Sequence, residues 1–227
     1  MADAAYGMLC DKILKFELVP GLVVSDHTLS QALNMSRTPI REALVRLEQD
    51  GLIEFDNNNK MVITHASIRD VEEIAQARIA IECRAVDLIF SRNGLTGEEK
   101  EAMHQLHATL VSHVANGELH ESYTADDAFH MAPVAFCGNT LLLKFFRLMR
   151  NQMMRTRYVT TILNPDWFKN TSDQHDHLLE IWLQGNPDAI KNSLVEHLNS
   201  FSSYINELVR KNPQFKSLPN LAMFFQH

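Results

Sequence analysis

The sequence has few cysteines, no long apolar run and no excess of positive charge, and each shortage excludes a class of protein. Cys10, Cys83 and Cys137 are an odd, scattered set without the spacing of a disulfide framework or of a cysteine metal site. This usage is typical of a reduced, cytoplasmic chain. No run of about twenty apolar residues could span a bilayer, and the first residues lack the apolar core of a signal peptide. We therefore expect no membrane partner.

The charge balance limits how the chain could bind nucleic acid. The formal net charge is −7, and up to His65 there are six Lys and Arg residues against nine Asp and Glu residues. Positive charge is local there, at Arg37, Arg41 and Arg46. Binding to DNA would depend on a few aimed contacts and on dimerisation, and it should weaken with salt. At 227 residues with 45% apolar content, the chain is long enough for two small domains.

The stretch SRTPIREALVRL, which begins at Ser36, has the features of a helix that presents two arginines. Ser36 is expected to cap its first turn, and Pro39 falls within that turn, where a missing N–H is tolerated. Apolar residues recur with helical spacing on one side, while Arg37 and Arg41 lie four apart and project together. Guanidinium groups pair with guanine edges or with phosphates. The alternative is a surface helix with solvated arginines.

The flanking residues complete a DNA-binding pattern. An amphipathic helix and a short helix capped by Ser25 or Asp26 precede the stretch. After it, Gly51 can end the helix in a left-handed conformation, and residues 52–55 and 61–64 are two short β-rich runs. This order of elements predicts a winged helix-turn-helix.

From Pro20 to Ile53 the chain reads PGLVVSDHTLSQALNMSRTPIREALVRLEQDGLI, which resembles the N-terminal pattern of the GntR family of bacterial transcriptional regulators. The resemblance implies binding to double-stranded operator DNA, with the two arginines on the operator and the wing near the minor groove. The residues to which it assigns DNA contacts are Ser36, Arg37, Thr38, Arg41 and Lys60. Two positions depart from the pattern: His27 stands where some members place a DNA-contacting arginine, and Lys60 stands where a wing glycine is usual.

Beyond His65 the β-rich residues give way to helical periodicity, and no convincing strand follows. Thr96 with Glu99 forms a capping box, and Asn186 before Pro187 starts the last helix. We predict a mainly α fold, in which the N-terminal winged helix-turn-helix is followed by an all-helical bundle of about six helices. The predicted parts are a DNA-binding domain in residues 1–66, a helical metal- and effector-binding domain in residues 67–211, and a C-terminal tail in residues 212–227.

The helical half resembles the FCD ligand-binding domain of the FadR subfamily within the GntR family. Three stretches carry the resemblance: ARIAIECRAVDLI, DDAFH followed by Gly138-Asn139, and QHDHLLEIWLQGNPDAIKNSLVEHL. Metal-binding members use an Asp-x-x-x-His pair and two later histidines, and here 197 minus 175 gives a spacing of 22 residues. The resemblance therefore implies a metal site made of Asp126, His130, His175 and His197.

The residues themselves leave two interpretations of this set open. Asp126 and His130 share a helical face, and His175 shares a stripe with apolar residues, whereas His177 points about 200° away and is expected to be exposed. Buried histidines and carboxylates cost free energy unless they are satisfied, and a divalent cation would satisfy all four. Three nitrogens and one oxygen suit Zn²⁺, Ni²⁺, Mn²⁺ or Fe²⁺. The alternative is ordinary hydrogen-bonded histidines in a chain that has eleven.

Arg78 is the first candidate for binding an effector. An organic acid could chelate the metal while this arginine neutralises it, because the helical stripe of Arg78 continues through Ile81, Glu82 and Ala85. The other interpretation of Arg78 is an intrahelical ion pair with Glu82.

These features together predict a homodimeric, DNA-binding transcriptional repressor and not an enzyme. Its operator affinity would be controlled by a small carboxylic acid bound at the metal centre. Two alternatives stay open: a metal-dependent enzyme fused to a DNA-binding module, and a metal-sensing regulator with no organic effector.

Overall fold

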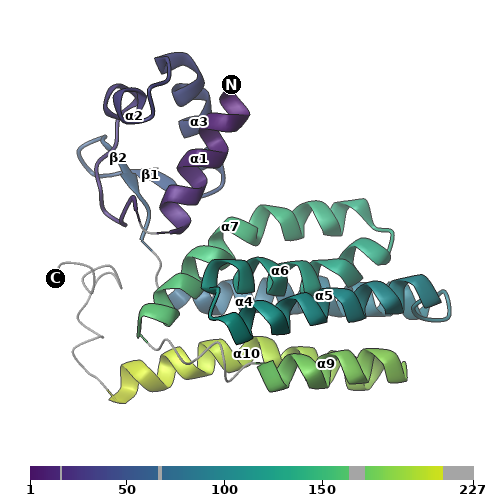
Figure 1. Cartoon of the computed structure of the whole chain (residues 1–227). Helices are drawn as coiled ribbons and strands as arrows, with labels where there is room; N and C mark the ends of the chain where they lie inside the picture. The colour runs from purple at the N-terminus through teal and green to yellow at the C-terminus, as the bar shows by residue number, and fades with distance from the viewer. Residues whose placement is uncertain (16, 66–67, 164–171, 212–227) are drawn as a thin grey trace. The chain divides into compact units, whose positions relative to one another are not determined.

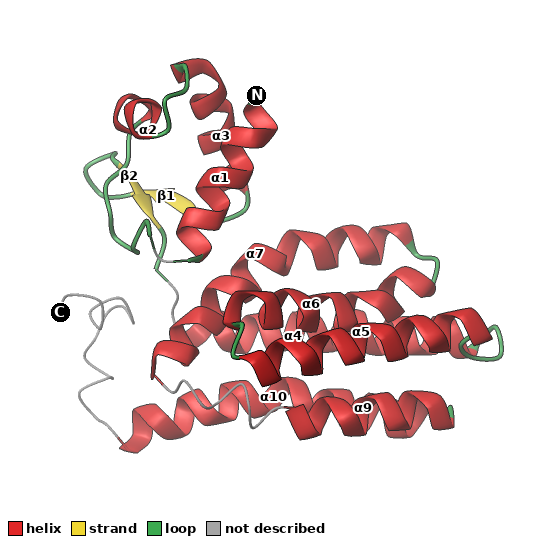
Figure 2. Ribbon diagram, in the orientation of Figure 1, coloured by secondary structure: helices red, strands yellow, loops and turns green. Residues whose placement is uncertain are grey.

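The computed structural model describes residues 1–15, 17–65, 68–163 and 172–211. The chain divides near residue 67 into two compact units, the first formed mainly by residues before this point and the second by residues after it. Figures 1 and 2 show short strands beside helices in the first unit and a bundle of helices in the second. The predicted tail, residues 212–227, lies outside the described residues.

The first unit folds as the predicted winged helix-turn-helix. Its elements are α1 (Ala2–Leu14), α2 (Asp26–Ala32), α3 (Arg37–Gln49), β1 (Ile53–Phe55) and β2 (Met61–Ile63). Helices α1 and α2 both pack against α3, and Leu9, Ile40 and Leu47 are fully buried between them. The two strands pair antiparallel, with Ile53 opposite Ile63, and form the wing hairpin. This arrangement buries the apolar side of α3 and leaves Arg37, Thr38 and Arg41 exposed near its start.

The prediction that the Ser36 side chain caps α3 is wrong. Ser36 occupies the N-cap position with an extended backbone, but its hydroxyl makes no capping hydrogen bond. A serine at the N-cap usually accepts a hydrogen bond from the backbone N–H of the second or third helical residue. The third residue here is Pro39, which has no N–H. In α2, by contrast, Ser25 Oγ accepts a hydrogen bond from the Thr28 N–H at 3.1 Å, and Thr28 Oγ1 accepts one from the Ser25 N–H at 3.2 Å. Of the two candidate caps of α2, Ser25 is therefore the one used.

The second unit is the predicted helical bundle. Its described helices are α4 (Ile68–Phe90), α5 (Gly97–Asn116), α6 (Leu119–Phe136), α7 (Thr140–Leu163), α9 (Ser172–Gln184) and α10 (Pro187–Lys211). Helix α4 packs against α6 and α10, while α5 packs against α6 and α9. Val86, Met103, Phe129, Trp182 and Leu194 come from five different helices and meet in one buried core. This core holds α6, α9 and α10 together at the place where the candidate metal ligands lie.

Both helix starts that were predicted in this half from capping residues are confirmed. Thr96 and Glu99 form a capping box at the start of α5. At the start of α10, the Asn186 side-chain oxygen accepts hydrogen bonds from the N–H groups of Asp188 and Ala189, both at 3.1 Å. None of the helices in the described part of the chain is long and apolar enough to cross a membrane.

Candidate metal centre and DNA-contacting helix

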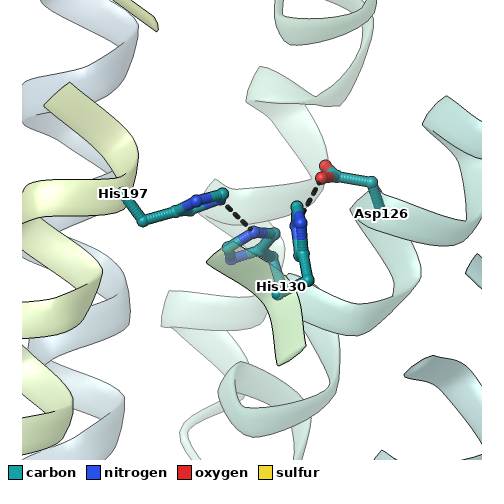
Figure 3. Close-up of side chains that lie close together, drawn as sticks. Asp126, His130 and His197 are labelled. Carbon is teal, nitrogen blue, oxygen red and sulfur yellow. Dashed lines mark hydrogen bonds and ion pairs between the residues drawn. The ribbon is translucent and has the colours of Figure 1, made fainter. Parts of the chain in front are cut away.

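Four side chains from three helices of the bundle converge on one point. Asp126 and His130 lie one turn apart on α6, His175 comes from α9 and His197 from α10. One ligand atom from each residue lies within 4.8 Å of the other three. Figure 3 shows Asp126, His130 and His197 directed toward a common centre. Since Asp126, His130 and His175 are buried and His197 is half-buried, water cannot satisfy most of these polar groups.

The spacing of the ligand atoms suits a single transition-metal ion. His175 Nε2 lies 2.8 Å from Asp126 Oδ1, and His130 Nε2 lies 3.1 Å from His197 Nε2. Metal bonds of about 2.0–2.2 Å place neighbouring ligand atoms about 2.8–3.6 Å apart and opposite ones at most about 4.4 Å apart. A contraction of a few tenths of an ångström at most would therefore fit the four atoms around one ion.

Two further side chains fix which nitrogen of each ring faces the centre. The Glu82 carboxylate on α4 accepts a hydrogen bond from His130 Nδ1 at 2.8 Å, and Gln174 Oε1 accepts one from His197 Nδ1 at 2.9 Å. Because both acceptors lack a proton to give, both rings carry their proton on Nδ1. Outer acceptors of this kind commonly orient metal-binding histidines. The Nε2 atoms of both rings are thus left with lone pairs.

These two lone pairs point at each other in the absence of a cation. Burial lowers the pKa of His130, and burial together with His175 lowers the pKa of His197 well below its ordinary value, so both rings are neutral near pH 7. Two neutral rings protonated on Nδ1 cannot form a hydrogen bond between their Nε2 atoms, which lie 3.1 Å apart. A bound cation would turn this repulsive contact into two favourable ones. The residues present therefore fit a divalent metal.

Arg78 forms the intrahelical ion pair with Glu82, which was one of the two roles that the sequence left open. Arg78 Nε donates to Glu82 Oε1 at 2.8 Å, and both side chains are buried. Burial raises the pKa of Glu82, but the charge of Arg78 and the hydrogen bonds from His130 and Arg78 outweigh it, and the net pKa lies below its usual range. Arg78 Nη2 is buried and has no hydrogen-bond partner among the described residues. The pair therefore leaves one charged donor available at the centre of the bundle.

The residues predicted to contact DNA lie on two separate elements of the first unit. Ser36, Arg37, Thr38 and Arg41 are exposed at the start of α3, and Lys60 is exposed at the end of the wing turn. Asp56 Oδ1 accepts hydrogen bonds from the backbone N–H groups of Asn58 and Lys60. Asn59 adopts the left-handed conformation in this turn, with φ of 58°. The wing therefore turns sharply without a glycine at position 60.

Comparison with known proteins gives the chain a family. The sequence pattern of the bacterial regulatory proteins of the gntR family matches residues 1–63, and that of the FCD domain matches residues 73–200, more than half of the chain. The chain belongs to the GntR family and carries an FCD domain. It is therefore a DNA-binding transcriptional regulator and not an enzyme, which removes the alternative of a fused metal-dependent enzyme.

Two relatives of this GntR regulator match it over more than nine-tenths of their length. It is 27% identical to YdhC, an uncharacterised HTH-type transcriptional regulator of Bacillus subtilis, covering 92% of each chain. It is 23% identical to the HTH-type transcriptional repressor RspR of Escherichia coli, covering 93% of this chain and 92% of RspR. The solved structure of E. coli McbR/YncC is similar with a TM-score of 0.75 at 19% identity, covering 91% and 97% of the two chains. At that identity the likeness shows the shared fold.

Sequence reasoning missed Gln174 and the orienting role of Glu82 in this GntR regulator. Glu82 shares a helical stripe with Arg78, which gave a local signal of a pair but none of its contact with His130 on another helix. Gln174 lies beside a candidate ligand in the sequence, yet it contacts His197 across α9 and α10. Both contacts depend on how the helices pack. The expectation that His177 is exposed is confirmed.

Proposed function

We propose that this GntR regulator is a homodimeric, cytoplasmic repressor that binds a two-fold operator in double-stranded DNA. Residues 1–66 bind the DNA, and residues 67–211 bind a divalent metal and a small carboxylic acid that controls operator affinity. The name of the E. coli relative RspR as a repressor supports repression. One recognition helix covers only a few base pairs, so pairing two copies on a two-fold site doubles the sequence that is read.

The observation that carries the metal part of this proposal is the contact between His130 and His197. Their Nε2 atoms lie 3.1 Å apart, and with both rings protonated on Nδ1 a cation bound by the two atoms would remove the repulsion between their lone pairs. Asp126 and His175 add an oxygen and a third nitrogen, a ligand set that suits Zn²⁺, Ni²⁺, Mn²⁺ or Fe²⁺. When bound, such an ion supplies a Lewis acid to which the carboxylate of an effector can bind.

Two features support control by an organic acid: the buried charged donor of Arg78, and a nearby cavity too small to admit a ligand without movement of the packed side chains. The buried Nη2 of Arg78 is a charged donor for a carboxylate oxygen. The cavity beside Glu82 and His130 has a volume of about 10 Å³, room for about one water molecule. A ligand larger than this that binds in the same cavity must therefore displace packed side chains. Its binding would differ in free energy between two arrangements of the bundle, which is the condition for shifting DNA affinity.

The proposal is tested on the DNA duplex that the wild-type protein enriches from a random-sequence library. Operator affinity is measured for protein that is metal-loaded, chelated, and metal-loaded with a panel of small carboxylic acids. We expect at least one acid to change the affinity about 5- to 150-fold, only when metal is present. If chelation changes the affinity and no acid does, the protein is a metal sensor without an organic effector. If neither changes it, the proposed control is wrong.

Replacing Arg41 by alanine is expected to remove specific DNA binding while the fold remains intact. A bidentate arginine–guanine contact contributes about 1–3 kcal/mol of discrimination, so preference for the contacted base should fall about 5- to 150-fold. The side chain of Arg41 is 65% exposed, and the melting temperature should therefore stay unchanged. Fluorescence anisotropy on the enriched duplex and on single-base variants measures this preference.

Arg84→Ala is the matched control, because it removes an exposed arginine from α4 in the other unit. We expect it to keep wild-type affinity and base preference. Retention of wild-type base preference by Arg41→Ala would mean that another element reads the operator.

A further inference from the structure

The two arginines at the start of α3 are held by one carboxylate from α2. Asp26, the first residue of α2, binds Arg37 through three contacts: Nη2 to Oδ1 at 2.8 Å, Nη2 to Oδ2 at 2.9 Å and Nε to Oδ2 at 3.2 Å. The same Oδ2 also accepts a hydrogen bond from Arg41 Nε. A single acidic side chain thus connects both helices of the helix-turn-helix at the surface predicted to face DNA.

The contacts use different edges of the two guanidinium groups. Arg37 gives Asp26 the edge formed by Nε and Nη2, whereas Arg41 gives only its Nε. Within the described part of the chain, the Nη1 and Nη2 groups of Arg41 make no hydrogen bond. These two groups form the terminal edge of the guanidinium, whose paired donors match the O6 and N7 atoms of guanine. Arg41 therefore keeps the edge that reads a base, and Arg37 has already used one of its edges.

The charges of Arg37, Arg41 and Asp26 and the exposure of their side chains explain why this three-residue contact is stable. Two guanidinium groups one helical turn apart repel each other, and a shared carboxylate offsets that repulsion. The Asp26 side chain is only 15% exposed, while those of Arg37 and Arg41 are 52% and 65% exposed. Hydrogen bonds from Arg37, followed by the one from Arg41, lower the pKa of Asp26 to about 2, so the carboxylate is ionised at any working pH. The arginines cover the acid and face outward.

We propose that Asp26 is a positioning residue for operator reading, which holds Arg41 by Nε so that its terminal edge is preorganised for a guanine. Arg37, whose Nε and Nη2 bind Asp26, would contact a phosphate instead of a base. A long side chain that is fixed before binding loses less conformational freedom in the complex, and the benefit is greatest for the one base that matches its geometry. This inference rests on the proposed role of α3 in binding DNA.

A different role of the same contact predicts the opposite behaviour. If Asp26 acts only as a negative charge that competes with DNA, its removal should strengthen binding to every sequence by a similar factor. If it positions Arg41, its removal should strengthen binding to unrelated duplexes while weakening the preference for the guanine. The base preference therefore separates a positioning role from simple repulsion.

The experiment repeats the selection from a random-sequence duplex library with four variants. Asp26→Asn removes the charge with little change in shape, Asp26→Glu restores the carboxylate, and Arg41→Ala removes the base reader. Glu48→Gln is the control, because it removes the same charge from an exposed position near the other end of α3. We expect Asp26→Asn to lose about tenfold of the preference at the position that Arg41→Ala also affects. Asp26→Glu should recover part of it, and Glu48→Gln should keep it.

Side-chain NMR of the free protein gives a second measurement that does not depend on DNA. The Nε–H signals of Arg37 and Arg41 should exchange slowly with water in the wild type and in Glu48→Gln, and rapidly in Asp26→Asn. An unchanged preference in a folded Asp26→Asn variant, or a uniform rise in affinity for all duplexes, would overturn the inference. If the wild type enriches no duplex, or if Arg41→Ala enriches the wild-type motif, the proposed function of α3 fails instead.

Discussion

His175→Ala is expected to abolish the stabilisation that a divalent metal would give to this GntR regulator. The His175 side chain is almost fully buried, and its Nε2 atom lies among the other candidate ligand atoms. A metal present at a thousand times its dissociation constant stabilises a folded protein by about 4 kcal/mol, which corresponds to a melting temperature about 10 °C higher. Without His175 this difference between metal-loaded and chelated protein should largely disappear. Thermal unfolding with and without added Zn²⁺ measures it, alongside elemental analysis.

His177→Ala provides the matched control on the same helix. His177 is exposed, and its Nε2 makes one long hydrogen bond of 3.4 Å with Ser193 Oγ. The comparison uses the difference between loaded and chelated samples of each variant, so the cavity left by a buried histidine does not enter it. We expect His177→Ala to keep the full metal-dependent difference. A loss in His177→Ala instead of His175→Ala would mean that the wrong histidine was chosen, and full retention in both variants would contradict a metal site in this cluster.

Glu82→Ala is expected to cost about 3–5 kcal/mol of folding free energy, because it leaves a buried positive charge without its partner. The side chains of Arg78 and Glu82 are only 7% and 5% exposed, and Glu82 also accepts the hydrogen bond from His130. Loss of this outer acceptor should in addition weaken metal binding about 10- to 100-fold. Urea unfolding of the chelated protein measures the first effect, and metal titration measures the second.

The same helix contains a matched pair for this test. Arg69 and Glu73 have the same i, i+4 spacing on α4 and a similar Nε–carboxylate contact of 2.6 Å, but their side chains are 84% and 56% exposed. Water and salt screen such a pair, so Glu73→Ala should leave the free energy of unfolding unchanged within error. Equal costs for Glu73→Ala and Glu82→Ala would mean that burial does not determine the strength of the pair.

Patterns within one helix could be predicted from the sequence. The apolar side of α3 required only helical spacing, and so did the shared face of Asp126 and His130 on α6. Family resemblance added the later histidines, because nothing local connects His197 with the other candidate ligands. Side-chain capping was predicted correctly at Ser25, Thr96 and Asn186, where a backbone N–H is available to donate. It was predicted wrongly at Ser36, because Pro39 has no N–H.

Contacts between helices could not be predicted, because they depend on packing angles and on the rotamers of long side chains. Asp26 had a local signal only as a possible helix cap, and its contact with two arginines of α3 needs the tight turn between the helices. The acceptors of the histidine rings, Glu82 and Gln174, come from helices whose register against α6 and α10 no sequence pattern defines. Hydrogen-bond partners of this kind therefore appear only once the bundle is assembled.

The convergence of α6, α9 and α10 on one point has a consequence for the lifetime of the protein. An ion held by all three helices would act as a cross-link that forms only after the chain has folded, and its binding energy would become folding energy. Chains made when metal is scarce would unfold more often and be degraded faster. The abundance of the regulator in the cell, in addition to its affinity for DNA, would then follow the supply of metal.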